Sequence, residues 1–193
     1  MSDENYILIA AVISFLGALI VAIITVKNQF YISREQISKD LMIQERQLLN
    51  ERIKYEFAVE RENLKKLHLV LSKIAIENSL TVSYIQTSSN MSSDYFSNRY
   101  LENWQHLKEA KAIADIYYQD IRREIKELEG QMSCFWGSQK SLLETSSSEN
   151  RTSWNGYLSE VEKMGRAISA NVESIQYFIS ERGKSISKEV LDI

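Results

Sequence analysis

Tyr6–Val26 reads YILIAAVISFLGALIVAIITV, an apolar run without a single charged residue. At about 1.5 Å of rise per residue, a helix of this length covers roughly 30 Å, which is the hydrocarbon thickness of a bilayer. The run therefore predicts a transmembrane helix over residues 6–26. Everything that follows it in the chain is expected to be anchored to a membrane.

A cleaved signal peptide is the alternative interpretation of this run. The residues before it, MSDEN, are acidic instead of basic, and the run is longer than an ordinary signal-peptide h-region. No clear A-x-A cleavage site closes it. These features favour an uncleaved anchor.

The flanking charges predict the orientation of the anchor. Lys and Arg near the end of a transmembrane helix favour the cytoplasmic side, whereas acidic residues contribute little. No Lys or Arg precedes the run, and after it come Lys27, Arg34, Lys39 and Arg46. We therefore expect residues 1–5 to form a short extracytoplasmic tail and residues 27–193 to be cytoplasmic, with the anchor in a bacterial inner membrane.

Small residues follow one face of the predicted anchor. Small residues let two helix backbones approach closely. In lipid, where water supplies no hydrophobic drive, this close packing stabilises helix pairs, so such a face predicts self-association. The alternative is that Ala, Ser and Gly are simply common in transmembrane helices. The small-residue face consists of Ala10, Ser14, Ala18 and Ala22, with Gly17 alongside.

The composition predicts an all-α protein. The chain has 193 residues and no proline, and proline is the residue that breaks helix interiors and marks loops. A few long helices joined by short turns are therefore expected, with enough chain after the anchor for one domain. The formal net charge is only −3, and each basic cluster has acidic neighbours, so no nucleic-acid surface is expected.

Apolar residues spaced alternately by four and three predict a coiled-coil seam in the helix after the anchor. The pattern continues upstream more loosely, with Arg34 and Gln44 at positions that a tight core would not favour. Nothing between residues 27 and 85 breaks a helix, so the anchor is expected to continue into it. The seam consists of Ile53, Phe57, Leu64, Leu67, Leu71 and Ile74, and its looser extension of Phe30, Ile37, Leu41 and Leu48.

Two polar stretches, residues 86–94 and 144–153, interrupt the periodic pattern and are predicted turns. They divide the chain into helices over about 27–85, 94–143 and 152–190. Amphipathic helices with short connections bury their apolar faces against one another, so these helices predict an up-down-up antiparallel three-helix bundle. In that order the two turns lie at opposite ends of the bundle, the second of them near the membrane.

The residues that usually carry chemistry form no motif. The two histidines, His68 and His106, lie on different predicted helices without an H-E-x-x-H sequence. No glycine-rich phosphate loop follows a strand, and the lone Cys134 forms neither an intramolecular disulfide nor a cysteine metal cluster. We therefore expect no catalytic residues, no cofactor and no metal, and a protein that is not an enzyme.

Two functional hypotheses remain. The first is a single-pass membrane protein whose bundle self-associates and holds a partner protein at the cytoplasmic face. The second is a membrane-perturbing effector of a phage-defence or toxin-antitoxin module, restrained or triggered through its bundle. A pore favours polar residues along one anchor face, and only Ser14 and Thr25 are available, so the first is preferred. The expected partners are the lipid bilayer, a second copy of the chain and an unidentified protein.

Overall fold

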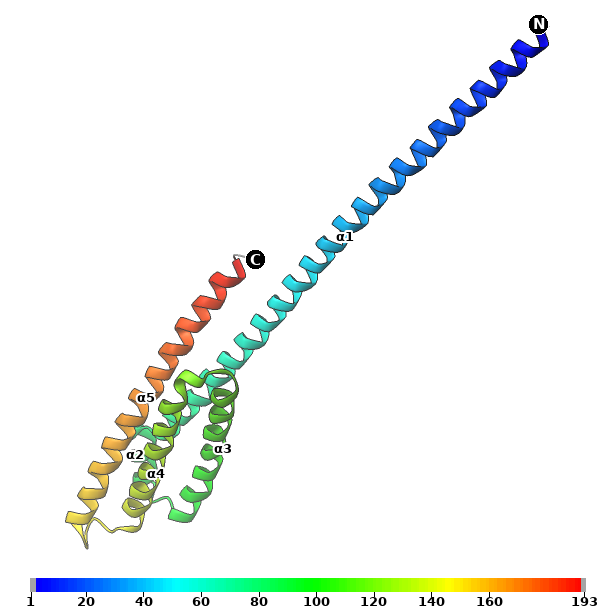
Figure 1. The fold of residues 1–193 in the computed structure, drawn as a ribbon. Coiled ribbons are helices and arrows are strands. Elements are labelled where there is room, and N and C mark those ends of the chain that lie inside the picture. The colour runs from blue at the N-terminus through cyan, green and yellow to red at the C-terminus, as the bar shows by residue number, and fades with distance from the viewer. Residues whose placement is uncertain (1–2, 192–193) are drawn as a thin grey trace. The chain divides into compact units, whose positions relative to one another are not determined.

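The computed structural model describes the backbone of residues 3–191 and the side chains of residues 12–191. All regular elements in this described part are helices, which confirms the all-α prediction (Figure 1). The residues form two compact units, Met1–Ile53 and Lys54–Ile193. Helix α1 (Asp3–Glu77) begins in the first unit and ends in the second, and it accounts for every described residue of the first.

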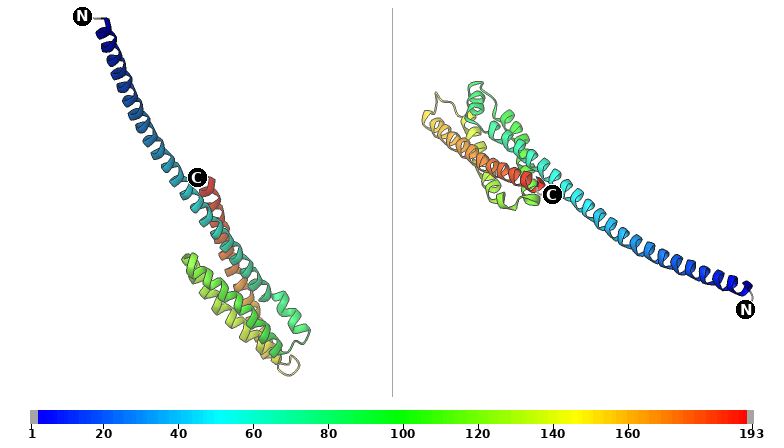
Figure 2. Two further views of the ribbon diagram at one scale, coloured as in Figure 1. Left: turned by 90° about the vertical axis from the view of Figure 1, so that its right-hand side faces the viewer. Right: turned by 90° about the horizontal axis from the view of Figure 1, so that it is seen from above.

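The second unit is a helical bundle. The last part of α1 packs there with four further helices. α4 runs antiparallel to α3, and α5 runs antiparallel to α4 (Figure 1, Figure 2). The prediction of a three-helix bundle is therefore wrong in the number of helices. The helices are α2 (Leu80–Ser88), α3 (Ser93–Tyr117), α4 (Arg122–Glu144) and α5 (Arg151–Leu191), with one 3-10 turn, η1 (Gln119–Ile121), between α3 and α4.

The predicted helix over 94–143 is a hairpin of α3 and α4. As one helix it would extend about 75 Å. Folding back at Tyr118 lets α4 pack against both α3 and α5, so the apolar face of each half is covered within the bundle.

Side chains on both sides of the reversal hold it in place. Tyr118 is 5% exposed, and its hydroxyl donates a hydrogen bond of 3.1 Å to the backbone oxygen of Glu60. Arg122 donates from Nη2 to the backbone oxygen of Asp115 at 2.8 Å, and its Nε lies 2.9 Å from the Asp115 carboxylate. These contacts therefore join the two sides of the turn and hold the turn against α1.

Helix α1 also ends earlier than predicted, at Glu77 instead of about residue 85. The Asn78 side-chain amide donates to the backbone oxygen of Ile74 at 2.7 Å, and the Ser79 hydroxyl accepts from the backbone N–H of Val82 at 3.3 Å. Short polar side chains that bond the nearby backbone in this way compete with helix continuation and cap the next helix. Ser79 is therefore the N-cap of α2.

The two predicted turns are present but shorter than expected. The first comprises residues 89–92, where Asn90 has φ of 52°, a left-handed conformation that asparagine tolerates better than most residues. The second comprises residues 145–150, and the Asn150 side chain caps α5 by accepting from the backbone N–H of Ser153 at 3.1 Å. The extra turn at Tyr118 was not predicted, because the apolar spacing continues through it.

The two turns lie at the same end of the bundle, not at opposite ends as predicted. Both contribute residues to one surface pocket of about 580 Å³. At the other end, Arg182 near the end of α5 binds Glu60 of α1. The α3–α4 reversal explains the difference, because it adds one more change of direction before α5.

The core of the bundle is formed by residues from α1, α3, α4 and α5. One polar cluster interrupts it where α2 packs on α4: the Ser83 hydroxyl donates to Gln139 Oε1 at 2.6 Å, and Gln139 Nε2 donates to Gln86 Oε1 at 3.3 Å. Buried polar groups are stable when hydrogen-bonded in this way. The largest side chains in the core include Leu67, Leu71, Ile74, Leu107, Ile125, Leu128, Met132, Phe135, Ile168 and Ile175.

Candidate functional site

The first candidate site is the apolar segment of α1. Among the described residues, one helix is long and apolar enough to cross a membrane by length and composition, namely α1 from Val12 onward. None of its apolar window is buried inside the protein, so it is not a core helix of this chain. Thr25, one of its few polar residues, donates its hydroxyl to the backbone oxygen of Val21 at 2.8 Å and leaves no free donor there.

The small-residue face remains a prediction. Ser14, Ala18 and Ala22 lie on one continuous helix, and they are exposed. Gly17 has open space where a Cβ would project, so within the chain nothing packs against it. Ala10 lies outside the residues whose side chains the structure describes.

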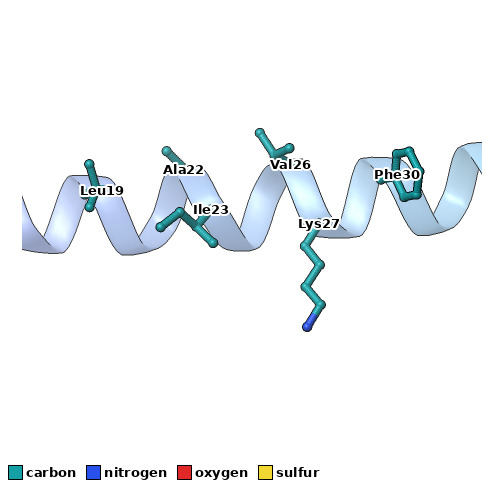
Figure 3. A pocket seen from close by; sticks show the side chains of 6 residues that line it. All are labelled: Leu19, Ala22, Ile23, Val26, Lys27 and Phe30. Carbon is teal, nitrogen blue, oxygen red and sulfur yellow. The ribbon is translucent and has the colours of Figure 1, made fainter.

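A shallow groove surrounds Ala22. It has a volume of about 540 Å³ and arises because the small Ala22 side chain lies between larger neighbours. In Figure 3, Ala22 and Val26 point to one side of the helix and Lys27 to the other. The groove is lined by Leu19, Ala22, Ile23, Val26, Lys27 and Phe30.

The predicted coiled-coil seam lies in two different environments. Ile53 and Phe57 are partly buried. The remaining four residues are buried in the core of the bundle and are covered by helices of the same chain, so they are not free to bind a second copy. These four are Leu64, Leu67, Leu71 and Ile74.

The looser extension of the seam is exposed. Phe30, Ile37, Leu41 and Leu48 are each more than half exposed. The Arg34 guanidinium carbon lies 5.8 Å from the centre of the Phe30 ring, a distance typical of a cation–π contact. Arg34 therefore lies over the Phe30 ring, and the other apolar side chains of the extension remain exposed.

An aromatic groove lies between α3 and α4. Tyr100 is central to it, with its ring 5.9 Å from that of Trp136 in a stacked arrangement and 5.8 Å from that of Trp104. Burial raises the pKa of Tyr100, and its hydroxyl has no hydrogen-bond partner within the described part of the chain. The groove has a volume of about 430 Å³ and is lined by Ser97, Tyr100, Leu101, Trp104, Ser133 and Trp136.

An ion-pair cluster closes the bundle at the end where α1 joins it. The Arg182 guanidinium binds the Glu60 carboxylate through two hydrogen bonds of 2.6 and 3.0 Å, and it also reaches Glu189 at 3.1 Å. The hydrogen bond to Glu60 raises the pKa of Arg182, and burial raises the pKa of the neighbouring Tyr118. The cluster ties α5 to α1.

The candidate metal ligands do not converge. His68 is exposed on α1, while Glu102 and His106 lie together on α3 beside a polar pocket of about 330 Å³. Among the described side chains, no group of three or more His, Cys, Asp and Glu residues is placed to hold a metal ion. Cys134 is a free, exposed thiol on α4.

The apolar segment of α1 and the exposed bundle surfaces are thus the only candidate sites that the described residues support. Comparison of the chain with protein-family models, with curated proteins and with solved structures gives no match in any of the three.

Proposed function

We propose that this chain is a single-pass membrane protein that self-associates and holds a partner protein at the cytoplasmic face of a bacterial inner membrane. One observation carries the proposal: a fully exposed apolar helix belongs to the same chain as a bundle that closes its own core. The apolar helix needs lipid around it, and the bundle is stable without lipid.

The anchor part of the proposal is supported by the cost of exposing apolar surface to water, which is about 25 cal/mol per Å². Soluble proteins rarely leave large contiguous apolar surfaces uncovered. From Val12 to Val26 the large apolar side chains are about half exposed or more, on every face of the helix. Lipid covers a helix from all sides, whereas a single soluble partner covers one face.

The tethering part is supported by the chemistry of the bundle. Its charged side chains form surface ion pairs, such as Lys66 with Glu109 and Arg99 with Glu77, and its core is mostly apolar, with buried polar side chains at the Gln139 cluster, Asn78 and Asn103. The open aromatic groove at Tyr100 and Trp136 is a surface of the kind that protein partners cover, because aromatic residues are enriched at interfaces. A bundle of this kind suits a binding module.

The lone cysteine gives a direct test of topology. Because Cys134 is exposed, a membrane-impermeant thiol reagent labels it wherever the reagent reaches the bundle. We expect no labelling in intact cells and full labelling after lysis, with Cys134→Ser as the control for specificity. Labelling in intact cells would place the bundle outside and exclude the cytoplasmic tether.

The effector hypothesis predicts a different result in living cells. With the tether, cells that express the native chain keep their membrane potential and grow as well as cells that express a variant with leucine at all four small-residue positions. The variant carries Ala10→Leu, Ser14→Leu, Ala18→Leu and Ala22→Leu and still inserts, since leucine is apolar. Depolarisation by the native chain that disappears in this variant would support the effector.

A further inference from the structure

An eleven-residue repeat follows the apolar segment. Residues 30–40 read FYISREQISKD and residues 41–51 read LMIQERQLLNE, so that apolar, glutamine and acidic residues recur at equivalent positions. Eleven residues complete three turns of an α-helix at about 3.67 residues per turn, so equivalent residues lie on one face. α1 is helical without interruption through both copies of the repeat.

The first and eighth positions of the repeat form an exposed apolar stripe. The same interval extends it backwards into the apolar segment, because Leu19 and Val26 lie eleven residues before Phe30 and Ile37. At about 100° per residue, all members fall within an arc of roughly 60°. The anchor stripe consists of Leu19, Val26, Phe30, Ile37, Leu41 and Leu48, which are between 47 and 67% exposed.

The position of the anchor stripe identifies what covers it. The stripe stays on the same face of the helix on both sides of the boundary between the apolar and polar segments. The apolar segment ends at Val26, and the polar segment begins at Lys27. A soluble partner covers only the polar part, and an unrelated membrane helix only the apolar part. A second copy of this chain carries both parts in the same order and inserts in the same direction.

We propose that two copies of this chain pair in parallel and in register along the anchor stripe. The proposal rests on the proposed function, because it requires both copies to be inserted in the same membrane. An eleven-residue repeat favours a right-handed supercoil, so the pair crosses with the opposite hand to a heptad coiled coil. The groove around Ala22, which contains Leu19, Val26 and Phe30, receives side chains of the second copy (Figure 3).

The anchor stripe differs from the small-residue face. The centre of Ser14, Ala18 and Ala22 lies about 110° around the helix from the centre of the stripe. Past the apolar segment, the apolar residues that come nearest to the small-residue face are Ile32 and Ile43, also eleven apart. Pairing through one face or the other therefore brings different residues together.

Disulfide cross-linking in native membranes tests the pairing. In full-length Cys134→Ser protein, single cysteines are introduced as Ile37→Cys and Leu48→Cys on the stripe. Ile32→Cys and Ile43→Cys are the matched controls, because these residues are 60 and 54% exposed and lie about 140° away from the stripe. Disulfides form only when Cα atoms approach within about 7 Å.

We expect the two stripe variants to form oxidised dimers at least about tenfold faster than the two controls. Equal rates at all four positions, or no dimers at any of them in the membrane fraction, would overturn the pairing and leave the proposed anchor intact. Faster dimers at Ile32→Cys and Ile43→Cys would assign the interface to the small-residue face. A chain found in the soluble fraction would overturn both the proposed function and the pairing.

Discussion

Replacing Leu16 and Ile20 by arginine is expected to move the protein from the membrane fraction to the soluble fraction. Both residues lie in the middle of the apolar segment, one turn apart, and they are 51 and 56% exposed, so neither substitution disturbs packing within the chain. An arginine at the centre of a transmembrane helix costs about 2.5–3.5 kcal/mol of insertion free energy, so the pair costs about 5–7 kcal/mol. Fractionation followed by carbonate extraction measures the change.

A matched pair outside the apolar segment controls for charge alone. Met42→Arg and Leu49→Arg also place two arginines on exposed positions of α1, 63 and 56% exposed, and both lie off the anchor stripe. This variant is expected to stay in the membrane fraction, because cationic residues beyond the bilayer core are tolerated. If the Leu16→Arg, Ile20→Arg protein remains resistant to carbonate, the apolar segment is not what holds the chain at the membrane.

The helices of this protein follow from its sequence because two strong signals act along the chain. The absence of proline predicts long helices, and the alternating spacing identifies buried positions such as Leu64, Leu67 and Ile74. The polar stretches that contain Asn90 and Asn150 mark two turns for a local reason, since the Ser92 and Asn150 side chains cap the helices that follow. These features depend on neighbours in the sequence.

The reversal at Tyr118 depends on distant residues instead. Buried residues before it, such as Leu107 and Ala114, and after it, such as Ile125 and Leu128, keep the four-and-three spacing through the turn. The same pattern therefore fits one long helix and two antiparallel ones. The contact of Tyr118 with Glu60 holds the chain in the second arrangement, and a local pattern does not show this contact.

Four residues of the anchor stripe, Phe30, Ile37, Leu41 and Leu48, belong to the predicted loose extension of the seam, whereas the eleven-residue repeat and its continuation to Leu19 and Val26 were not predicted. A search for spacings of four and three makes Arg34 and Gln44 part of the upstream seam, which then looks imperfect. With an interval of eleven, neither Arg34 nor Gln44 falls at the first or eighth position of the repeat. Phe30, Ile37 and Leu41 do fall at these positions. The recurrence of the pattern of residues 30–40 in residues 41–51 is the sequence signal of this stripe.

The polar cluster at Gln139 joins two segments that the sequence did not bring together. Gln139 extends the four-and-three spacing of α4 beyond Phe135, yet as a polar residue it gives no apolar signal. Its partner Ser83 belongs to α2, whereas the helix predicted over about 27–85 includes Ser83. Only the break at Asn78 turns Ser83 toward α4, where it donates to Gln139 at 2.6 Å.

Replacing Phe135 by alanine is expected to lower the free energy of unfolding of the bundle by about 3–5 kcal/mol. Phe135 is 1% exposed on α4 and lies across from Gly165 of α5, where a Cβ would come within 3.6 Å of its ring. Truncation removes the ring from the α4–α5 contact, and Gly165 has no side chain with which to fill the cavity. Neighbouring helices relax only in part around such a cavity.

Tryptophan fluorescence measures this loss in the full-length protein, because Trp104, Trp136 and Trp154 all belong to the bundle unit. Denaturant unfolding in detergent micelles then reports on the bundle, whose midpoint is compared with that of Tyr177→Ala. Tyr177 is an aromatic residue of α5 that is 70% exposed, so its removal is expected to change stability by no more than about 0.5 kcal/mol. Equal midpoints for the two variants would mean that α4 and α5 do not pack through Phe135, because only a buried ring makes the two truncations differ.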